Sequence, residues 1–412
     1  MKFFVKTLIV AACSAAALLS QPLDHRIEIL FANNREVRAA EKTYKSTLEM
    51  VKAAGALPDP MIDGSLFLQK IQTGNGPMES QLMLGQKFPL WGKLSRQRKI
   101  AVLKAEIAKL KLNDKKVSVA FNLRKTWANY VELRNSLRIL NDYYSELESF
   151  RSSALTQYAT GTGVTQHPIL KLQIESSLVE SQINDLESEL ESVLNNLNAL
   201  FDNKFSTDLF SETWQVVVPE HSAVEWSSTA KNNNPHYNIA LLEREIALLQ
   251  HQLTIRQNYP DLVMGMTYTV IGNETSLSAT TPGKDAFGLK LGLNLPLWFK
   301  RNEARVKSTE LMVKAKDESI EATWNRVEDD ILSSLKDLQE IAQTYQLYES
   351  KLIREADQML SSAFAAYETG KITFLDVLDS ERMAVRVKLS FEQTKAKRNI
   401  ASAMLLQASG LY

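Results

Sequence analysis

The chain consists of two copies of one unit, and this internal repeat constrains its fold more than any other feature. The segment GQKFPLWGK at residues 85–93 parallels GLNLPLWFK at residues 292–300, and their prolines lie 207 residues apart. Further along, YATG at residues 158–161 parallels YETG at residues 367–370, at an offset of 209 residues. Similar segments that recur in the same order at one spacing indicate a duplicated structural unit.

The repeat predicts three parts. These are a targeting segment at residues 1–20, a first structural repeat at 21–215 and a second structural repeat at 216–412. In each repeat a first helix is expected to end at a proline turn, ALPDP at 56–60 and NYPD at 258–261. Two strand-like segments follow, and then two long helices that reverse at the Tyr-x-x-Gly turn.

Strands are predicted at about 62–72, 80–88, 262–271 and 286–295. The last of them places Phe287, Leu289, Leu291, Leu293 and Leu295 on one face, with small or polar residues between them. A period of two is typical of a strand with one apolar face, and about ten residues suit a tilted membrane strand. An ordinary soluble sheet with one buried face explains the same pattern, so the strands alone leave both interpretations open.

The helices are unusually long. No proline or glycine occurs from Lys93 to about Gln157, or from Lys300 to about Tyr367, and about 60 helical residues span about 90 Å. The helix that follows the first reversal has a heptad seam suited to coiled-coil packing, formed by Ile183, Leu186, Leu190, Val193, Leu197 and Leu200. The acidic residues around this seam, including Glu175, are interpreted as a solvated face without a functional site.

Four strands in one chain raise a closure problem. The smallest bacterial barrels need about eight strands, and an open sheet edge in lipid leaves backbone groups without hydrogen-bond partners. If the strands enter a membrane, other chains must supply the rest of the barrel. The strand count does not choose between a dimer, a trimer and a tetramer.

The N-terminus is typical of an export signal. Lys2 and Lys6 precede an apolar stretch at residues 7–12, and small residues follow. The only cysteine of the chain, Cys13, follows Val-Ala-Ala in a sequence similar to a lipobox, so a lipid anchor at Cys13 and simple cleavage after it are both open. A single cysteine allows no disulfide within the chain. No other stretch has the ~18 apolar residues of a membrane helix.

Composition and motifs argue against several functions. Lys+Arg and Asp+Glu both number 48, so the chain lacks the basic surplus typical of nucleic-acid binding. It contains no Gly-x-Ser-x-Gly, phosphate-loop or His-Glu-x-x-His motif, and its five histidines are scattered without metal-ligand spacing. We therefore expect no enzyme activity, no catalytic residues, no cofactor and no metal site.

Taken together, these features resemble the outer-membrane efflux protein (TolC) family, which includes outer-membrane components of RND-type and heavy-metal tripartite efflux pumps. The resemblance covers the chain after its targeting segment, and it rests on the repeat, the ALPDP turn, the GQKFPLWGK segment and AYETGKITFLDVLD at 366–379. It implies a mostly α fold with a small membrane β-barrel portion, built from long coiled-coil helical hairpins and two strands in each unit. It also implies a homotrimer whose 12-stranded β-barrel is continued by an α-helical barrel.

The resemblance further implies a passive duct for drugs, metal ions or other small molecules. Its partners would be a periplasmic adaptor (membrane fusion protein), an inner-membrane pump of RND or ABC type, and outer-membrane lipid. The duct would lie in the outer membrane of a Gram-negative bacterium, with a long periplasmic portion. A soluble periplasmic coiled-coil adaptor is the alternative, but such a protein would need a Gly-rich lipoyl-like domain that this sequence does not show.

By the same resemblance, Asp376 and Asp379 would line a periplasmic gate as two rings of three carboxylates. They lie one helical turn apart on one face, and mutual repulsion would raise some of their pKa values. Tyr367 matches a gate tyrosine of the family. Ile372 stands where the family namesake has an arginine, and His167 lies near the position of its aspartate partner, so the family's ion pair is in doubt here.

Other roles are expected for the turns and for two tryptophans. Asp376 also has the spacing of a capping box with Thr373 at the start of a helix, and this role can coexist with the gate. The expected adaptor contacts are the exposed tips of the two hairpins, formed by Gly161, Thr162, Gly163, Val164, Gly370, Lys371 and Ile372. Trp91 and Trp298 suit the aromatic girdle at a membrane edge, although packing on a helix is an alternative for each.

Overall fold

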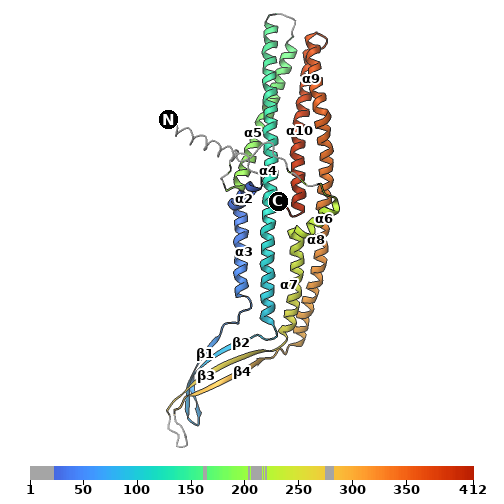
Figure 1. The fold of residues 1–412 in the computed structure, drawn as a ribbon. Helices are drawn as coiled ribbons and strands as arrows, with labels where there is room; N and C mark the ends of the chain where they lie inside the picture. Colours follow the sequence, from blue (N-terminus) through green and yellow to red (C-terminus); the bar gives the residue numbers. More distant parts are fainter. Residues whose placement is uncertain are drawn as a thin grey trace, which may run out of the picture. The chain divides into compact units, whose positions relative to one another are not determined.

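The computed structural model describes residues 23–160, 165–202, 205, 216, 218, 220–273 and 283–412. This part of the chain is mostly helical and holds four antiparallel strands in one sheet (Figure 1), which confirms the predicted fold class at that level. The expected targeting segment at residues 1–20, with Cys13, lies outside the described residues.

The elements follow one another in the same order in both halves of the chain. The first half contains α2 (Leu23–Asn33), α3 (Arg35–Ala53), β1 (Met61–Thr73), β2 (Gly76–Phe88), α4 (Lys93–Ala159) and α5 (Gln166–Leu200). The second half contains α6 (Ala223–Asn233), α7 (Pro235–Gln257), β3 (Asp261–Ile271), β4 (Ala286–Asn294), α8 (Phe299–Leu347), the π-helical turn η2 (Tyr348–Leu352), α9 (Ile353–Glu368) and α10 (Phe374–Ala408). None of the described helices is long and apolar enough to cross a membrane.

The chain divides into two compact units that do not follow the halves of the sequence. The helical unit comprises the chain up to Ala40, Leu112–Pro235 and Asn325–Tyr412. The strand-bearing unit comprises Glu41–Lys111 and His236–Trp324. Each unit therefore takes residues from both halves, and α3, α4 and α8 contribute residues to both units.

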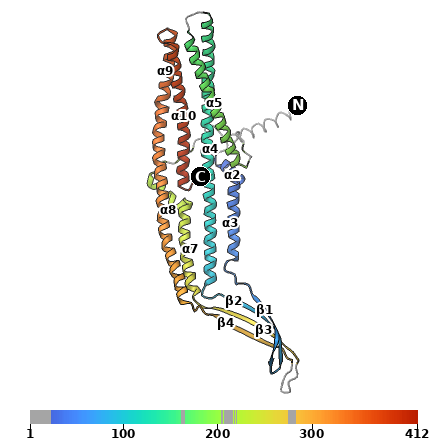
Figure 2. The same ribbon diagram turned by 180° about the vertical axis from the view of Figure 1, so that it is seen from behind.

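In the helical unit, side chains from four helices form a continuous apolar core. Trp127 and Leu123 of α4 pack with Leu30 of α2 and Leu197 of α5, and all four are at most 2% exposed. A second cluster joins α4 and α5 to Leu378 of α10. The helices α4 and α5 lie side by side, as do α9 and α10, in both views (Figures 1 and 2). The heptad seam predicted in α5 faces this core, since Val193 and Leu197 are buried.

Two equivalent asparagines hold the junctions of this unit. Asn34 separates α2 from α3, and its amide donates to the carbonyl of Leu200 at the end of α5 at 3.0 Å. Asn234 separates α6 from α7, and its amide donates to the carbonyl of Ala408 at the end of α10 at 2.8 Å. The last carbonyls of a helix have no partner within it, so each asparagine satisfies one of them.

In the strand-bearing unit, the cross-strand register builds one wide apolar face. The strands pair in the order β1-β2-β3-β4, and residues paired across an antiparallel sheet share a face. The apolar face consists of Ile62, Leu66, Leu82, Leu84, Phe88, Leu262, Met264, Met266, Tyr268, Phe287, Leu289, Leu291 and Leu293. The opposite face is mostly polar or small and includes Gln81, Gly85, Lys87, Gly265, Thr267, Gly288 and Lys290, together with the apolar Met61, Met83 and Val263.

The structure departs from the expected unbroken helix between Lys300 and Tyr367. The π-helical turn η2 separates α8 from α9, whereas α4 has no such break over 67 residues. A π-turn widens the helix by one residue and shifts the following side chains around its axis. Beside it, Tyr345 and Tyr348 both contact the ring of Phe391 in α10, with centroids 5.4 and 6.1 Å away.

We predict that Asn234→Ala lowers the free energy of unfolding by about 1–3 kcal/mol, because the half-buried Ala408 carbonyl loses its donor. The matched control is Asn233→Ala, whose exposed amide only contacts Thr229 of its own helix, and we expect its effect to stay within about 0.5 kcal/mol. Denaturant unfolding of the purified variants measures both. Equal effects of the two substitutions would contradict the junction role.

Candidate functional site

The reversal between α9 and α10 is a Schellman turn. Gly370 has φ of +68°, a conformation that glycine adopts at little cost. The amides of Gly370 and Lys371 donate to the carbonyls of Tyr367 and Ala366, each at 2.9 Å. This turn leaves Lys371 exposed and Ile372 half-buried at the tip. The other expected tip residues, Gly161, Thr162, Gly163 and Val164, lie outside the described residues.

Asp376 caps the start of α10. Its carboxylate accepts hydrogen bonds from the amide of Thr373 at 2.8 Å and from the hydroxyl of Thr373 at 2.6 Å, so the capping box is present. These hydrogen bonds lower the pKa of Asp376 below its usual value. Within one chain, the cap therefore shifts this pKa opposite to the shift expected from a ring of carboxylates.

Asp379 lies one turn further along α10, beside cations of both hairpins. Its carboxylate is 3.8 Å from Nζ of Lys171 in α5 and 3.6 Å from Nη1 of Arg382 in α10. The side chain of Asp379 is 60% exposed, and exposed pairs of this kind contribute little to stability. Their effect is to place Asp379 within a mixed patch of charge rather than an acidic one.

Arg382 makes a stronger link between the two hairpins. Its Nε donates to Oε1 of Glu175 at 2.9 Å, and its Nη2 donates to Oε2 of the same carboxylate. Bidentate pairs of this type are directional as well as strong. Glu175 is 8% exposed, and the hydroxyl of Tyr143 also donates to it at 3.1 Å. Assigning Glu175 to a solvated face was therefore wrong, because a partner in the other hairpin buries it.

Glu381 is a second buried carboxyl group near the same pair. It is 1% exposed, and within the described part of the chain neither oxygen makes a hydrogen bond of ordinary geometry. Burial, reinforced by the nearby Glu146 carboxylate, raises the pKa of Glu381 to about 9, although Lys388 opposes the shift. Glu381 is therefore neutral at physiological pH. Sequence reasoning missed it because a glutamate within a charged helix gives no signal of burial.

The remaining gate candidates have separate surroundings. Tyr367 is 38% exposed, and its ring meets Phe374 edge-on at 6.0 Å. Phe374 also contacts Phe150 of α4 at 5.1 Å, so aromatic packing connects the hairpins below the tip. His167 is exposed at the start of α5. Asp376, Asp379 and Tyr367 thus lie around one turn, while the bidentate cross-hairpin ion pair is made by Glu175 and Arg382.

The two exit tryptophans differ in their contacts. Trp91 has φ of +64°, its indole donates to the Pro260 carbonyl at 2.9 Å, and its ring lies 5.5 Å from Tyr259. This tryptophan therefore packs on the turn before β3 and remains 51% exposed. Trp298 is 69% exposed. Among the described residues, no three His, Cys, Asp or Glu side chains form a group that could hold a metal ion.

With the geometry of both units established, the chain can be compared with known proteins. Residues 226–411 match the family model described as outer membrane efflux protein. The chain carries an outer membrane efflux protein domain. This confirms the family resemblance drawn from the repeat and from the segment at 366–379.

Similarity to individual proteins extends over nearly the whole chain. The cobalt-zinc-cadmium resistance protein CzcC of Cupriavidus metallidurans is 19% identical over 372 residues, covering 90% of this chain and 85% of CzcC. A membrane protein from Pseudomonas aeruginosa has a TM-score of 0.79 at 14% identity, covering 94% of this chain and 90% of that chain. The CmeC outer membrane channel of Campylobacter jejuni has a TM-score of 0.77 at 15% identity, with coverages of 94% and 85%.

We predict that Glu381→Gln stabilises the protein at pH 8 by at least about 1 kcal/mol. Between the ordinary pKa of 4.5 and the raised value of about 9, the native state retains a proton that the unfolded state has lost. Raising the pH across this window therefore favours unfolding, by up to about 1.4 kcal/mol per pH unit. The neutral amide removes this dependence, and the advantage should vanish below about pH 4.

Thermal unfolding across this pH range measures the effect. Glu368→Gln is the control, because this glutamate is exposed at the end of α9. Parallel pH profiles for the wild type and Glu381→Gln would show that Glu381 is not protonated in the native state.

Proposed function

We propose that this protein is the outer-membrane channel component of a tripartite efflux system, a passive duct that catalyses no reaction. The observation that carries this proposal is the exposed apolar face of the sheet. Phe287, Leu289, Leu291 and Leu293 are 62–78% exposed along one strand, and the paired strands extend the same face. An apolar face of this width is costly in water, whereas lipid would cover it without further protein.

The unpaired edges of the sheet support a closed oligomer. Three copies would bring twelve strands together, with polar faces inward and apolar faces toward lipid. In this proposal the homotrimer has a 12-stranded β-barrel that an α-helical barrel continues. Trp91 and Trp298, which directly follow β2 and precede α8, would then lie at the membrane edge.

The helix reversals would form the periplasmic end of the duct. The tips, including Gly370, Lys371 and Ile372, are proposed contacts of a periplasmic adaptor, which would connect the duct to an inner-membrane pump of RND or ABC type. Asp376, Asp379, Tyr367 and His167 are proposed to surround the gate. The Glu175–Arg382 pair would hold the two hairpins together there, in place of the ion pair that Ile372 and His167 leave in doubt.

The cargo proposed is a solute small enough for the gate, including metal ions and drugs. CzcC is by name a cobalt-zinc-cadmium resistance protein, and divalent cations are therefore one class to test. A soluble periplasmic adaptor is the weaker candidate, because the family match and the fold both belong to outer-membrane channels.

We predict that the protein, expressed in a Gram-negative host, fractionates with the outer membrane as a detergent-resistant trimer. Leu289→Arg should reduce its amount in that fraction severalfold, because a cation on a lipid-facing strand costs about 2–4 kcal/mol at mid-membrane. Thr267→Arg is the control, because its position lies on the polar face that already carries Lys290. Recovery of the wild type in the soluble periplasm would refute the channel proposal.

We predict that Asp376→Asn with Asp379→Asn lowers the cation selectivity of the reconstituted channel. Asparagine still accepts the capping hydrogen bonds at the start of α10, so the charge is removed without unwinding the helix. Reversal potentials in a salt gradient measure the change. Asp329→Asn, an exposed acid in α8, should leave them unaltered, and unaltered potentials in the double variant would refute the gate assignment.

A further inference from the structure

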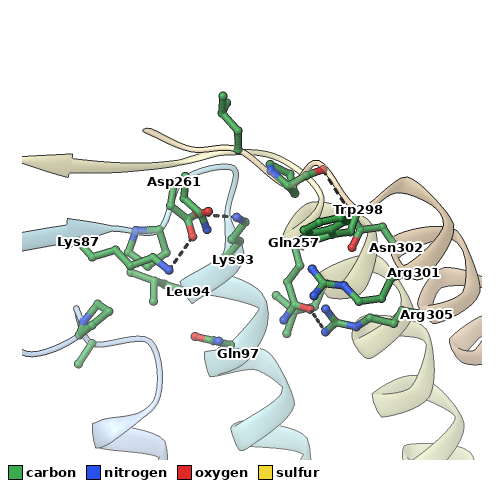
Figure 3. Close-up of a pocket in the computed structure, with 17 residues that line it drawn as sticks. Lys87, Lys93, Leu94, Gln97, Gln257, Asp261, Trp298, Arg301, Asn302 and Arg305 are labelled. Carbon is green, nitrogen blue, oxygen red and sulfur yellow. Dashed lines mark hydrogen bonds and ion pairs between the residues drawn. The ribbon is translucent and has the colours of Figure 1, made fainter. Parts of the chain in front are cut away.

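The strand-bearing unit contains a pocket of about 580 Å³ where its strands meet its helices (Figure 3). Its walls come from the turn after α3, the ends of β2 and β4, the first turns of α4 and α8, and the end of α7. Lys87, Asp261 and Asn294 belong to the polar face of the sheet. The strand residues of the lining therefore lie on the polar side of the sheet.

The pocket has a strong excess of positive charge. Lys87, Lys93, Arg301 and Arg305 line it, and Asp261 is the only acidic residue of the lining. The Asp261 carboxylate is already shared, since it lies 2.6 Å from Nζ of Lys93 and 3.1 Å from Nζ of Lys87. Four cations against one carboxylate leave three positive charges without compensation in the lining.

Several donors in this lining remain available to a ligand. Lys93 is only 5% exposed, and two of its three ammonium hydrogens bond to Asp261 and to the Tyr259 carbonyl at 2.8 Å. Arg305 bonds only to the neutral Gln257 amide oxygen, at 2.8 Å, and Arg301 makes no ion pair with any described residue. Figure 3 shows Arg301 and Arg305 extending from α8 toward Gln257.

The surroundings add to this positive potential and supply an apolar wall. Arg301 stands on the first turn of α8, where the helix dipole favours anions, and Arg305 follows one turn later. Asn302, only 6% exposed, brings a buried amide to the same place. Leu94, Leu253 and the largely exposed indole of Trp298 also line the pocket.

From this arrangement we infer that the pocket binds a phosphate oxyanion. Guanidinium groups match phosphate oxygens in bidentate geometry, and the Lys93 ammonium faces the same space as a point charge. The phosphate can come from solution or from the headgroup of an anionic lipid, whose apolar part would contact the wall at Trp298. This inference concerns the strand-bearing unit alone and does not require the channel proposal.

The test uses the full-length protein in neutral detergent, with inorganic pyrophosphate as the probe. Tryptophan fluorescence reports binding, and Trp298→Phe identifies the part of the signal that comes from the pocket. We expect a saturable change for the wild type and at least a tenfold weaker affinity for Arg301→Gln with Arg305→Gln. The inference would be overturned if the wild type showed no saturable change in this experiment and also none in the lipid experiment below.

Matched variants separate the site from general charge and from folding. Lys300→Gln with Lys307→Gln removes two cations from the same helix outside the pocket lining, and its affinity should equal that of the wild type. Arg301→Lys with Arg305→Lys retains the charge, so it should bind more tightly than the glutamine variant. If the two double glutamine variants lose affinity equally, the inference is wrong.

A second experiment distinguishes the two sources of phosphate. The protein is placed in nanodiscs of phosphatidylcholine, with or without phosphatidylglycerol, and pyrophosphate is titrated again. If the headgroup occupies the pocket, phosphatidylglycerol should produce the Trp298 signal by itself and weaken pyrophosphate binding. Equal pyrophosphate affinity in both nanodiscs supports the site with dissolved phosphate as its source.

Discussion

Hydrogen bonding in the sheet stops at β1 and β4, because in the described chain each of these strands pairs on one side only. The sheet also exposes an apolar face on all four strands. Water satisfies the open edges but not the apolar face, and lipid satisfies the face but not the edges. Both demands are met only when further strands pair with β1 and β4 in lipid. The proposed oligomer would meet both demands. The helices of each copy would then have to fit the same oligomer.

The helical unit depends on specific side chains at the ends of its helices rather than along them. Asn34 and Asn234 bond to the last turns of α5 and α10, while Asp376 caps the start of α10. Between these ends, heptad packing tolerates many apolar residues. Ionisable residues inside the bundle need specific surroundings. Glu175 is paired with Arg382, and burial favours the protonated form of Glu381. The cross-hairpin contacts therefore carry more specificity than the seam.

The local patterns predicted well the features that depend on neighbouring residues. The alternation of Leu289 and Leu291 located β4, and the spacing from Thr373 to Asp376 predicted the cap. Features that depend on distant partners could not be predicted in this way. Glu175 resembles its exposed neighbours until Arg382, 207 residues away, is placed beside it. The π-helical turn at Tyr348–Leu352 likewise has no proline or glycine to mark it, and its Tyr348 contacts Phe391 of another helix. The pocket cations come from segments more than 200 residues apart, with Lys87 and Lys93 inside one copy of the repeated segment and Arg301 and Arg305 just after the other.

This distinction explains why the fold persists at 14–19% identity. Alternation in the strands, heptads in the helices and small turns at the reversals are patterns that many sequences satisfy. The charge at a given position is less constant than these patterns, because one substitution can remove it or reverse its sign. The sequence resemblance places Ile372 where a cation is expected, while Glu175 and Arg382 form a pair between the hairpins. The similar structures therefore show the fold of this protein, but its proposed gate and its basic pocket must be derived from its own side chains.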